Sequence, residues 1–359
     1  MRILILPGDG IGPEIMAATR KALDALERRL GLGIEYRERA IGLAAHAKEG
    51  STLSDKTLAA VEAADGAILG PCDTYAYPPQ EKGGVNPSAT MRKLFDLYAN
   101  IRPSRARPGV PAKAPDMDLV VARENTEGFY ADRNMFSGSG EFMPTKDVAL
   151  AVRKITAGGS RRIARAAFEL ARTRRKKVAS AEKRNVMKTG VLWHEVVTRI
   201  HKEHYPDIAL EHVLADNCAM QLVRWPKQYD VIVTDNLFGD MLSDVAAMLT
   251  GSLGMLPSAS LGAADEKTKR RKSLYEPVHG SAPDIAGTGV ANPIAMIASF
   301  GMALRYSFGM GEWAGRIDRA IAAVLANGIR TRDIAGGGTA NASTAQMGAA
   351  ILKELQALA

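Results

Sequence analysis

Short apolar runs alternate with longer amphipathic stretches along most of this sequence. The runs lie at 2–7, 33–39, 66–70, 118–124, 176–183, 208–216 and 229–235. Runs rich in Val, Ile and Leu are typical of buried strands, whereas the stretches between most of them have a helical period. Strands that alternate with helices predict an α/β fold.

One interval interrupts this alternation. Residues 131–156 are polar, contain Gly and Ser, and have no helical period. An element with so little apolar surface is not stable alone, so we predict a protruding arm that packs against a second subunit. The expected assembly is a homodimer.

Length and composition set the size and class of the protein. The chain has 359 residues, of which 46% are hydrophobic and 24% charged, which predicts a globular protein with one large or two intertwined domains. Its two cysteines, Cys72 and Cys218, are too few for a disulfide scaffold, so both are predicted to be reduced and buried. The apolar stretch at the N-terminus is too short for a signal peptide, and a cytoplasmic location is expected.

The net charge of +8 raises the possibility of nucleic-acid binding. Much of it lies in two basic clusters, residues 172–177 and 267–272, without interleaved aromatic residues. We interpret both clusters as solvated loops, and the charge as an attraction for an anionic substrate. A non-catalytic, nucleic-acid-binding protein is kept as the alternative.

The segment GDGIG at 8–12 follows a predicted strand and precedes a helix. It lacks the third glycine of a dinucleotide-binding fingerprint, which argues against a Rossmann fold. We interpret it as a tight turn capped by Asp9.

Three arginines lie near predicted strand and helix ends, Arg92, Arg102 and Arg123. Each alone suits a surface salt bridge, but together they suit a substrate with several carboxylates, which guanidinium groups bind in a bidentate manner. Tyr130 and Lys183 are residue types that transfer protons when a site shifts their pKa. Lys183 also follows a strand, where open α/β sheets bind ligands.

Asp240 and Asp244 lie one helical turn apart in FGDMLSD, after the strand YDVIVTD, and Asp216 follows the earlier strand IALEHVL. Carboxylates four residues apart point in nearly the same direction, and they repel each other unless a cation lies between them. Three aspartates without His or Cys predict Mg²⁺ or Mn²⁺. The alternative is the solvated edge of an ordinary helix.

The stretch YEPVHGSAPDIAGTGVANP at 275–293 is rich in Gly and Pro around His279 and Asp284. We predict an ordered loop, because a loop with this much special backbone geometry more often binds a ligand than only connects elements.

With these motifs in order, the chain resembles the β-decarboxylating hydroxyacid dehydrogenases, the family of isocitrate, 3-isopropylmalate, homoisocitrate and tartrate or D-malate dehydrogenases. The motifs that carry the resemblance are LPGDGIGPEI, MRKLFDLYANIRP, RENTEGFY, EKRNV, ADNCAMQLV, DNLFGDMLSD and EPVHGSAPDIAGTGVANP. They extend over essentially the whole chain.

The resemblance implies the isopropylmalate/isocitrate dehydrogenase-like fold, an α/β fold with mixed sheets that is not a Rossmann fold. Its two domains would be a nucleotide-side domain from residues 1–98 and 252–359, and a central dimerisation, metal and substrate domain from residues 99–251. The arm at 131–156 would clasp the partner of a homodimer.

The resemblance also implies the reaction, an oxidative decarboxylation of a 3-substituted (2R)-malate to a 2-oxo acid and CO₂. The three arginines would bind the malate carboxylates, and Asp240 and Asp244 would hold Mg²⁺ or Mn²⁺. Asp216 and Lys183 would come from the other subunit. Lys183 would accept the proton of the 2-hydroxyl as hydride leaves for the nicotinamide, and Tyr130 would protonate the product of decarboxylation.

The cofactor contacts implied by the resemblance lie in the HGSAPD loop and at Asn292: His279, Gly280, Ser281, Ala282, Pro283, Asp284 and Asn292. Asp284 can accept hydrogen bonds from a ribose 2′-hydroxyl and repels a 2′-phosphate, so NAD is expected.

In the family, the residues before the first arginine contact the substituent on C3, and here they are VNPSATM at 85–91. Asn86 and Ser88 suit a polar substituent, whereas Ser88-Ala89 also leaves room for an isopropyl group. The substituent therefore stays open among the isopropylmalate, isocitrate and homoisocitrate class, with tartrate or D-malate as the alternative. Binding of nucleic acid or membrane is not expected.

Overall fold

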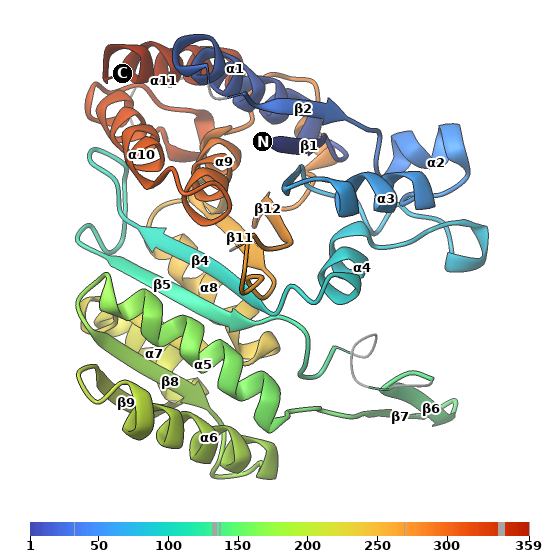
Figure 1. Ribbon diagram of the computed structural model, residues 1–359, viewed down its shortest axis with the longest axis vertical. Helices are drawn as coiled ribbons and strands as arrows, with labels where there is room; N and C mark the ends of the chain where they lie inside the picture. The colour runs from blue at the N-terminus through green and yellow to red at the C-terminus, as the bar shows by residue number, and fades with distance from the viewer. Residues whose placement is uncertain (32, 131–134, 136–137, 269, 337–341, 359) are drawn as a thin grey trace.

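A single large sheet forms the frame of the protein, in a computed structural model that describes all residues except 32, 131–134, 136–137, 269, 337–341 and 359 (Figure 1). Its strands follow the spatial order β2-β1-β3-β12-β11-β4-β5-β10-β8-β9. They are β1 (Arg2–Leu6), β2 (Glu35–Glu38), β3 (Gly66–Leu69), β4 (Ala99–Arg105), β5 (Asp118–Glu124), β8 (Lys177–Glu182), β9 (Ala209–Leu214), β10 (Val231–Thr234), β11 (Pro257–Leu261) and β12 (Ser273–Pro277).

Two parallel blocks make up this mixed sheet. Strands β2, β1, β3 and β12 are parallel to one another, as are β5, β10, β8 and β9. The two blocks are joined through antiparallel pairings of β12 with β11, β11 with β4, and β4 with β5. The blocks therefore point their carboxyl ends in opposite directions.

Helices cover both faces of the sheet. They are α1 (Gly12–Leu30), α2 (Leu43–Glu49), α3 (Asp55–Ala63), α4 (Pro87–Leu94), α5 (Ala157–Arg172), α6 (Lys188–His204), α7 (Ala215–Arg224), α8 (Asn236–Leu249), α9 (Ile294–Tyr306), α10 (Gly311–Ala326) and α11 (Thr344–Leu358). In the view of Figure 1, α5 and α6 lie in front of the second block, and α7 and α8 lie behind it. Among the described residues, every helix is too short or too polar to cross a lipid bilayer.

Separate apolar clusters hold these layers together. One of them packs α5 and α6 on the second block around Phe168 and Trp193, which are both essentially fully buried. Another packs α7 and α8 on the opposite face around Cys218 and Leu242. Burying such large side chains contributes about 1.5–3 kcal/mol each.

The strands also divide by their origin in the sequence. Strands β2, β1, β3, β12 and β11 come from residues 1–98 and 252–359, and the other five come from residues 99–251. This division follows the predicted domain boundaries, which stay a prediction because the sheet runs through both groups without a break.

The predicted arm contains a hairpin of β6 (Glu141–Thr145) and β7 (Val148–Ala151), and its residues 131–134 and 136–137 lie outside the described residues. Figure 1 shows the hairpin projecting from the rest of the chain. All nine of its strand residues are exposed, including Phe142, Met143 and Leu150.

Several sequence interpretations need correction. The loop predicted at 275–293 begins later, because Tyr275, Glu276 and Pro277 belong to β12. Cys72 is only partly buried, although Cys218 is buried as predicted, and both thiols are free.

The basic cluster at 172–177 is not simply a solvated loop. Arg174 forms ion pairs with Asp118 and Asp230, both at 2.8 Å, and these bonds tie the turn before β8 to the starts of β5 and β10. Asp230 is almost fully buried, so Arg174 neutralises a carboxylate that would otherwise be costly to bury.

Candidate active site

The turn at 8–12 holds the 279–292 loop in position. The backbone N–H of Ile11 donates to the carbonyl of Ser281 at 2.8 Å. A Cβ atom on Gly10, whose φ is +56°, would lie 2.0 Å from that carbonyl oxygen, so only glycine fits. Asp9 does not cap this turn as predicted, because its carboxylate accepts hydrogen bonds from Leu43, Asp73 and Tyr77 instead.

Arg102 and Arg123 lie on one face of the sheet. Arg123 of β5 pairs across the strands with Asn100 of β4, and residues two apart on a strand share a face, which brings Arg102 to the same side. Their side chains are only 5% and 3% exposed. Two buried guanidinium groups this close need an anion between them.

Asp240 of α8 supplies that anion. Its Oδ1 accepts hydrogen bonds from Arg123 at 2.6 Å and Arg102 at 2.9 Å. Burial opposes ionisation of Asp240, but the two guanidinium groups outweigh it and hold the pKa of the carboxyl at about 2. Burial lowers the pKa of Arg123 to about 9, and the positive charge of Arg102 contributes.

Helix α8 holds its carboxylates toward this cluster. Asp235 caps the helix by accepting from the N–H of Phe238 at 3.0 Å, directly after β10. A Cβ atom on Gly239 would lie 2.6 Å from Cγ of Arg123, so glycine lets the arginine pass close to the helix. Asp244, one turn beyond Asp240, lies 4.0 Å from Arg102, and its side chain is 57% exposed.

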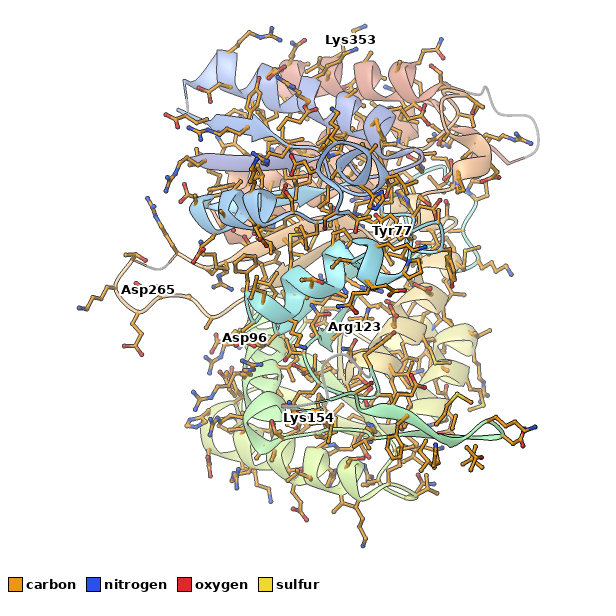
Figure 2. The ribbon with its side chains drawn as sticks, turned by 90° about the vertical axis from the view of Figure 1, so that its right-hand side faces the viewer. Tyr77, Asp96, Arg123, Lys154, Asp265 and Lys353 are labelled. Atoms are coloured by element: carbon orange, nitrogen blue, oxygen red, sulfur yellow. The ribbon has the colours of Figure 1, made fainter. Side chains whose placement is uncertain are left out.

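Tyr130 joins the same cluster. Its hydroxyl donates to Oδ2 of Asp240 at 2.6 Å, and the guanidinium of Arg123 lies 5.7 Å from the centre of its ring. In the sequence, Tyr130 lies between the end of β5 and the start of the hairpin. Arg123, the other residue of this ring contact, is labelled in Figure 2.

Arg92, on α4, is paired with a different carboxylate of the site, that of Glu276. Its guanidinium forms an ion pair with the buried carboxylate of Glu276 on β12, and it donates to Asn125 at 3.3 Å. Ser88, one turn earlier, also donates to Glu276, at 3.1 Å. Asn86 instead caps α4, because its side chain accepts from the N–H of Ala89 at 3.1 Å.

Lys183 and Asp216 form a separate pair at the ends of β8 and β9. Nζ of Lys183 lies 2.6 Å from Oδ1 of Asp216, and this hydrogen bond lowers the pKa of the carboxyl. Within the described part of the chain, no hydrogen bond or ion pair joins this pair to Asp240 or Asp244. One chain therefore brings together two of the three predicted metal ligands, and the third lies with Lys183.

The loop after β12 lines an open cleft of about 660 Å³. Residues of the predicted cofactor loop, His279, Gly280, Ala282, Asp284 and Asn292, lie in its wall together with Ile11, Arg332 and Asp333. Burial lowers the pKa of His279, and its Nε2 is buried without a hydrogen-bond partner among the described residues. Ser281 and Pro283 do not line the cleft; Ser281 instead anchors the loop to Ile11.

Several residues that contribute to the site were not predicted. Glu276 lies inside the EPVHGSAPD motif, and Asn125 lies inside RENTEGFY, so a search of these motifs for polar residues would have found them. Asn236 accepts from Nε of Arg123 at 2.8 Å, and Ser243 accepts from Arg102 at 2.8 Å. No signal in the sequence marked Asp333, which accepts from Asn292 at 3.0 Å.

Comparison with known proteins decides the family. Residues 2–351 match the family described as isocitrate/isopropylmalate dehydrogenase. The chain belongs to this family. It is 52% identical to the 3-isopropylmalate dehydrogenase of Nitrobacter winogradskyi, over 99% of this chain and 98% of that protein. It is also 52% identical to the 3-isopropylmalate dehydrogenase of Brucella suis, over the same shares of the two chains.

A solved structure supports the same conclusion. The isocitrate dehydrogenase from Methylococcus capsulatus has a TM-score of 0.86 and 39% identity, and the match covers 99% of both chains. The predicted fold class is confirmed, and the protein is an oxidoreductase of the isocitrate/isopropylmalate dehydrogenase family acting on a CH–OH group. Family membership favours this enzyme over the non-catalytic, nucleic-acid-binding alternative.

Proposed function

We propose that this protein oxidises and decarboxylates a 3-substituted (2R)-malate, with NAD as hydride acceptor and Mg²⁺ or Mn²⁺ as the metal. The observation that carries this proposal is the convergence of Arg102, Arg123 and Tyr130 on Asp240, with Arg92 beside them on α4. Three guanidinium groups at one site suit a substrate with two or more carboxylates.

The donor set fits a hard divalent ion. Asp240 and Asp244 offer carboxylate oxygens one helical turn apart, and the exposed Asp244 has only a distant arginine contact at 4.0 Å. A bound metal would polarise the 2-hydroxyl group and the carbonyl that follows it, and NAD would accept the hydride. Arg102 and Arg123 hydrogen-bond to Asp240 and keep its carboxylate ionised in the low-pKa state that a metal ligand needs.

Two residues of the chain move protons in this scheme. Lys183 is the base that accepts the proton of the 2-hydroxyl. Tyr130 donates its hydroxyl proton to C3 after CO₂ has left, and the hydrogen bond to Asp240 orients this hydroxyl before substrate arrives.

A second copy of the chain is part of the proposal. Lys183 and Asp216 pair with each other, and the active site needs a base and a third metal ligand. Large apolar side chains are exposed on α7 and α8, the helices that carry Asp216 and Asp240: Met220, Val223, Met241 and Met248. Together with the exposed apolar residues of the β6–β7 hairpin, they form a surface that suits a homodimer with shared active sites.

For the substituent on C3 we favour an aliphatic group, and 3-isopropylmalate first. Ser88 donates its hydroxyl proton to Glu276, and this buried carboxylate would repel a further carboxylate on C3. The relatives that are 50–52% identical are named 3-isopropylmalate dehydrogenase. Isocitrate and homoisocitrate remain the second choice because of the solved relative, and tartrate or D-malate the third.

Cofactor choice gives a direct test. Asp284 lines the cleft and is exposed, so its carboxylate would accept hydrogen bonds from the ribose hydroxyls of NAD and repel the 2′-phosphate of NADP. We expect kcat/KM to be at least about 10-fold higher with NAD than with NADP. Asp284→Asn should lower the ratio of kcat/KM with NAD to kcat/KM with NADP, mainly by lowering KM for NADP. Asp265→Asn, in an exposed loop away from the cleft, is the matched control, and a higher kcat/KM with NADP in the unchanged protein would refute the assignment.

A further inference from the structure

A cluster of two histidines and one glutamate lies beside the proposed active site and takes no part in the reaction above. Glu182 ends β8, His212 lies on the adjacent strand β9, and His194 lies on α6. One ring nitrogen of each histidine and one carboxylate oxygen of Glu182 lie within 4.8 Å of one another. The two rings are 4.0 Å apart between centres and tilted by 56°.

One ring nitrogen of each histidine lacks a hydrogen-bond partner among the described residues. Nδ1 of His194 and Nδ1 of His212 are both buried and have no hydrogen-bond partner among the described residues. Nε2 of His212 is within 2.9 Å of the Thr198 hydroxyl, which fixes the plane of that ring. Buried nitrogens without partners are costly, and a metal ion is one partner that would satisfy both.

His212 is also in the right charge state. Burial lowers the pKa of His212 to about 4, and His194 contributes, so the ring is neutral at neutral pH and keeps a lone pair for a metal. Glu182 is essentially fully buried and supplies one negative charge.

We propose that Glu182, His194 and His212 bind a transition-metal ion of the Zn²⁺ type at a second site. Two imidazoles and one carboxylate are a known zinc donor set, in which water takes the fourth position, and imidazole nitrogen disfavours Mg²⁺. Zinc–nitrogen bonds of about 2.0–2.1 Å place the donors of a tetrahedral ion roughly 3.3 Å apart, so binding would draw together the three donor atoms, which now lie within 4.8 Å of one another.

One group competes with the metal for Glu182. The guanidinium of Arg184 forms an ion pair with this carboxylate, and the backbone N–H of Arg184 also donates to it. The Arg184 side chain is 36% exposed, so it can turn into solvent when a cation takes its place. The backbone hydrogen bond can stay, because the carboxylate has a second oxygen.

The test measures metal binding and does not depend on turnover. The purified protein is stripped with a chelator, supplied with excess Mg²⁺ to fill all-oxygen sites, and dialysed against Zn²⁺ or Co²⁺. We expect about one Zn²⁺ per chain by elemental analysis, and with Co²⁺ the intense visible absorption of a four-coordinate site. His194→Gln and His212→Gln should each lower zinc affinity at least about 10-fold.

His204→Gln is the matched control, because His204 lies exposed at the end of the same helix α6. It should bind zinc as the unchanged protein does. Circular dichroism checks that each variant is folded, and if His212→Gln is not, the part-exposed His194→Gln carries the test. Zinc binding that persists in the folded His194 variant would overturn the proposal. So would a cobalt complex of the unchanged protein without four-coordinate absorption.

Discussion

Replacing Lys183 with methionine is expected to lower kcat by about 10²–10⁴-fold, the range for loss of a general base. Methionine keeps an unbranched side chain but cannot accept a proton or pair with Asp216, whose carboxylate now lies 2.6 Å from Nζ. The cofactor cleft is built from other elements, so NAD binding should persist. Turnover is followed as NADH formation, and NAD binding by calorimetry.

Lys177→Met is the matched control for this variant. Lys177 lies at the start of the same strand β8 and also pairs with an acid, Glu211 at 3.3 Å, but it is at the far end from the site. It should retain near-normal kcat. Wild-type rates in Lys183→Met would remove Lys183 from the reaction, whereas loss of NAD binding as well would point to a folding defect.

Replacing Asp240 with asparagine is expected to lower Mn²⁺-dependent kcat/KM by at least about 10²-fold, comparable with losing one essential electrostatic contact. The amide is neutral, so a proposed metal ligand is weakened, and the buried guanidinium groups of Arg102 and Arg123 lose their shared anion. The apparent KM for Mn²⁺ should rise in the same variant. Titration of activity with Mn²⁺ measures both effects.

Asp318→Asn controls for the loss of an arginine-paired aspartate. Its side chain is 40% exposed and pairs with Arg107 at 2.8 Å, against 37% exposure for Asp240. This variant should keep its Mn²⁺ dependence. If Asp240→Asn also keeps it, Asp240 is only the partner of Arg102 and Arg123 and not a metal ligand.

The two inactive variants together test whether active sites are shared. If Lys183 comes from one subunit and Asp240 from the other, mixed dimers contain one intact site and one doubly damaged site. Random reassembly should then recover up to about a quarter of wild-type activity. No recovery, with mixed dimers present by mass spectrometry, would mean that each chain builds its own site.

Seven strands of the large sheet could be predicted from the sequence, but β4, β11 and β12 could not. The predicted strands are continuous apolar runs, such as β10 with its four buried residues. Strand β11 reads PSASL and is fully buried, because Ser258 and Ser260 have hydrogen-bond partners inside the sheet. Strands that bury serine have no hydrophobic pattern by which a sequence could reveal them.

The candidate site could also be predicted only in part from the sequence. Arg102, Arg123, Tyr130 and Asp240 were each chosen for their chemistry, and the structure brings them within hydrogen-bond distance around one carboxylate. Glu276 was missed although it lies in the EPVHGSAPD motif, because its partner Arg92 lies 184 positions away in the sequence.

Asn86 and Ser88, the residues predicted to bind the C3 substituent, show that sequence spacing alone does not identify the contacts of a side chain. Asn86 was predicted to contact substrate, but its side-chain oxygen caps α4, and Ser88 bonds to an acid 188 positions away. The cap is a local contact three residues away, whereas the Ser88 contact depends on the tertiary fold. Their part in substrate binding stays a prediction.

The most direct measurement is NADH formation with Mn²⁺ across 3-isopropylmalate, isocitrate, homoisocitrate, tartrate and D-malate, with CO₂ release followed in parallel. We predict equal amounts of NADH and CO₂, and the highest kcat/KM with 3-isopropylmalate. A higher value with isocitrate would overturn the aliphatic assignment of the C3 substituent but keep the reaction. Absence of NADH with all five substrates, in a folded protein loaded with Mn²⁺, would contradict the proposed function.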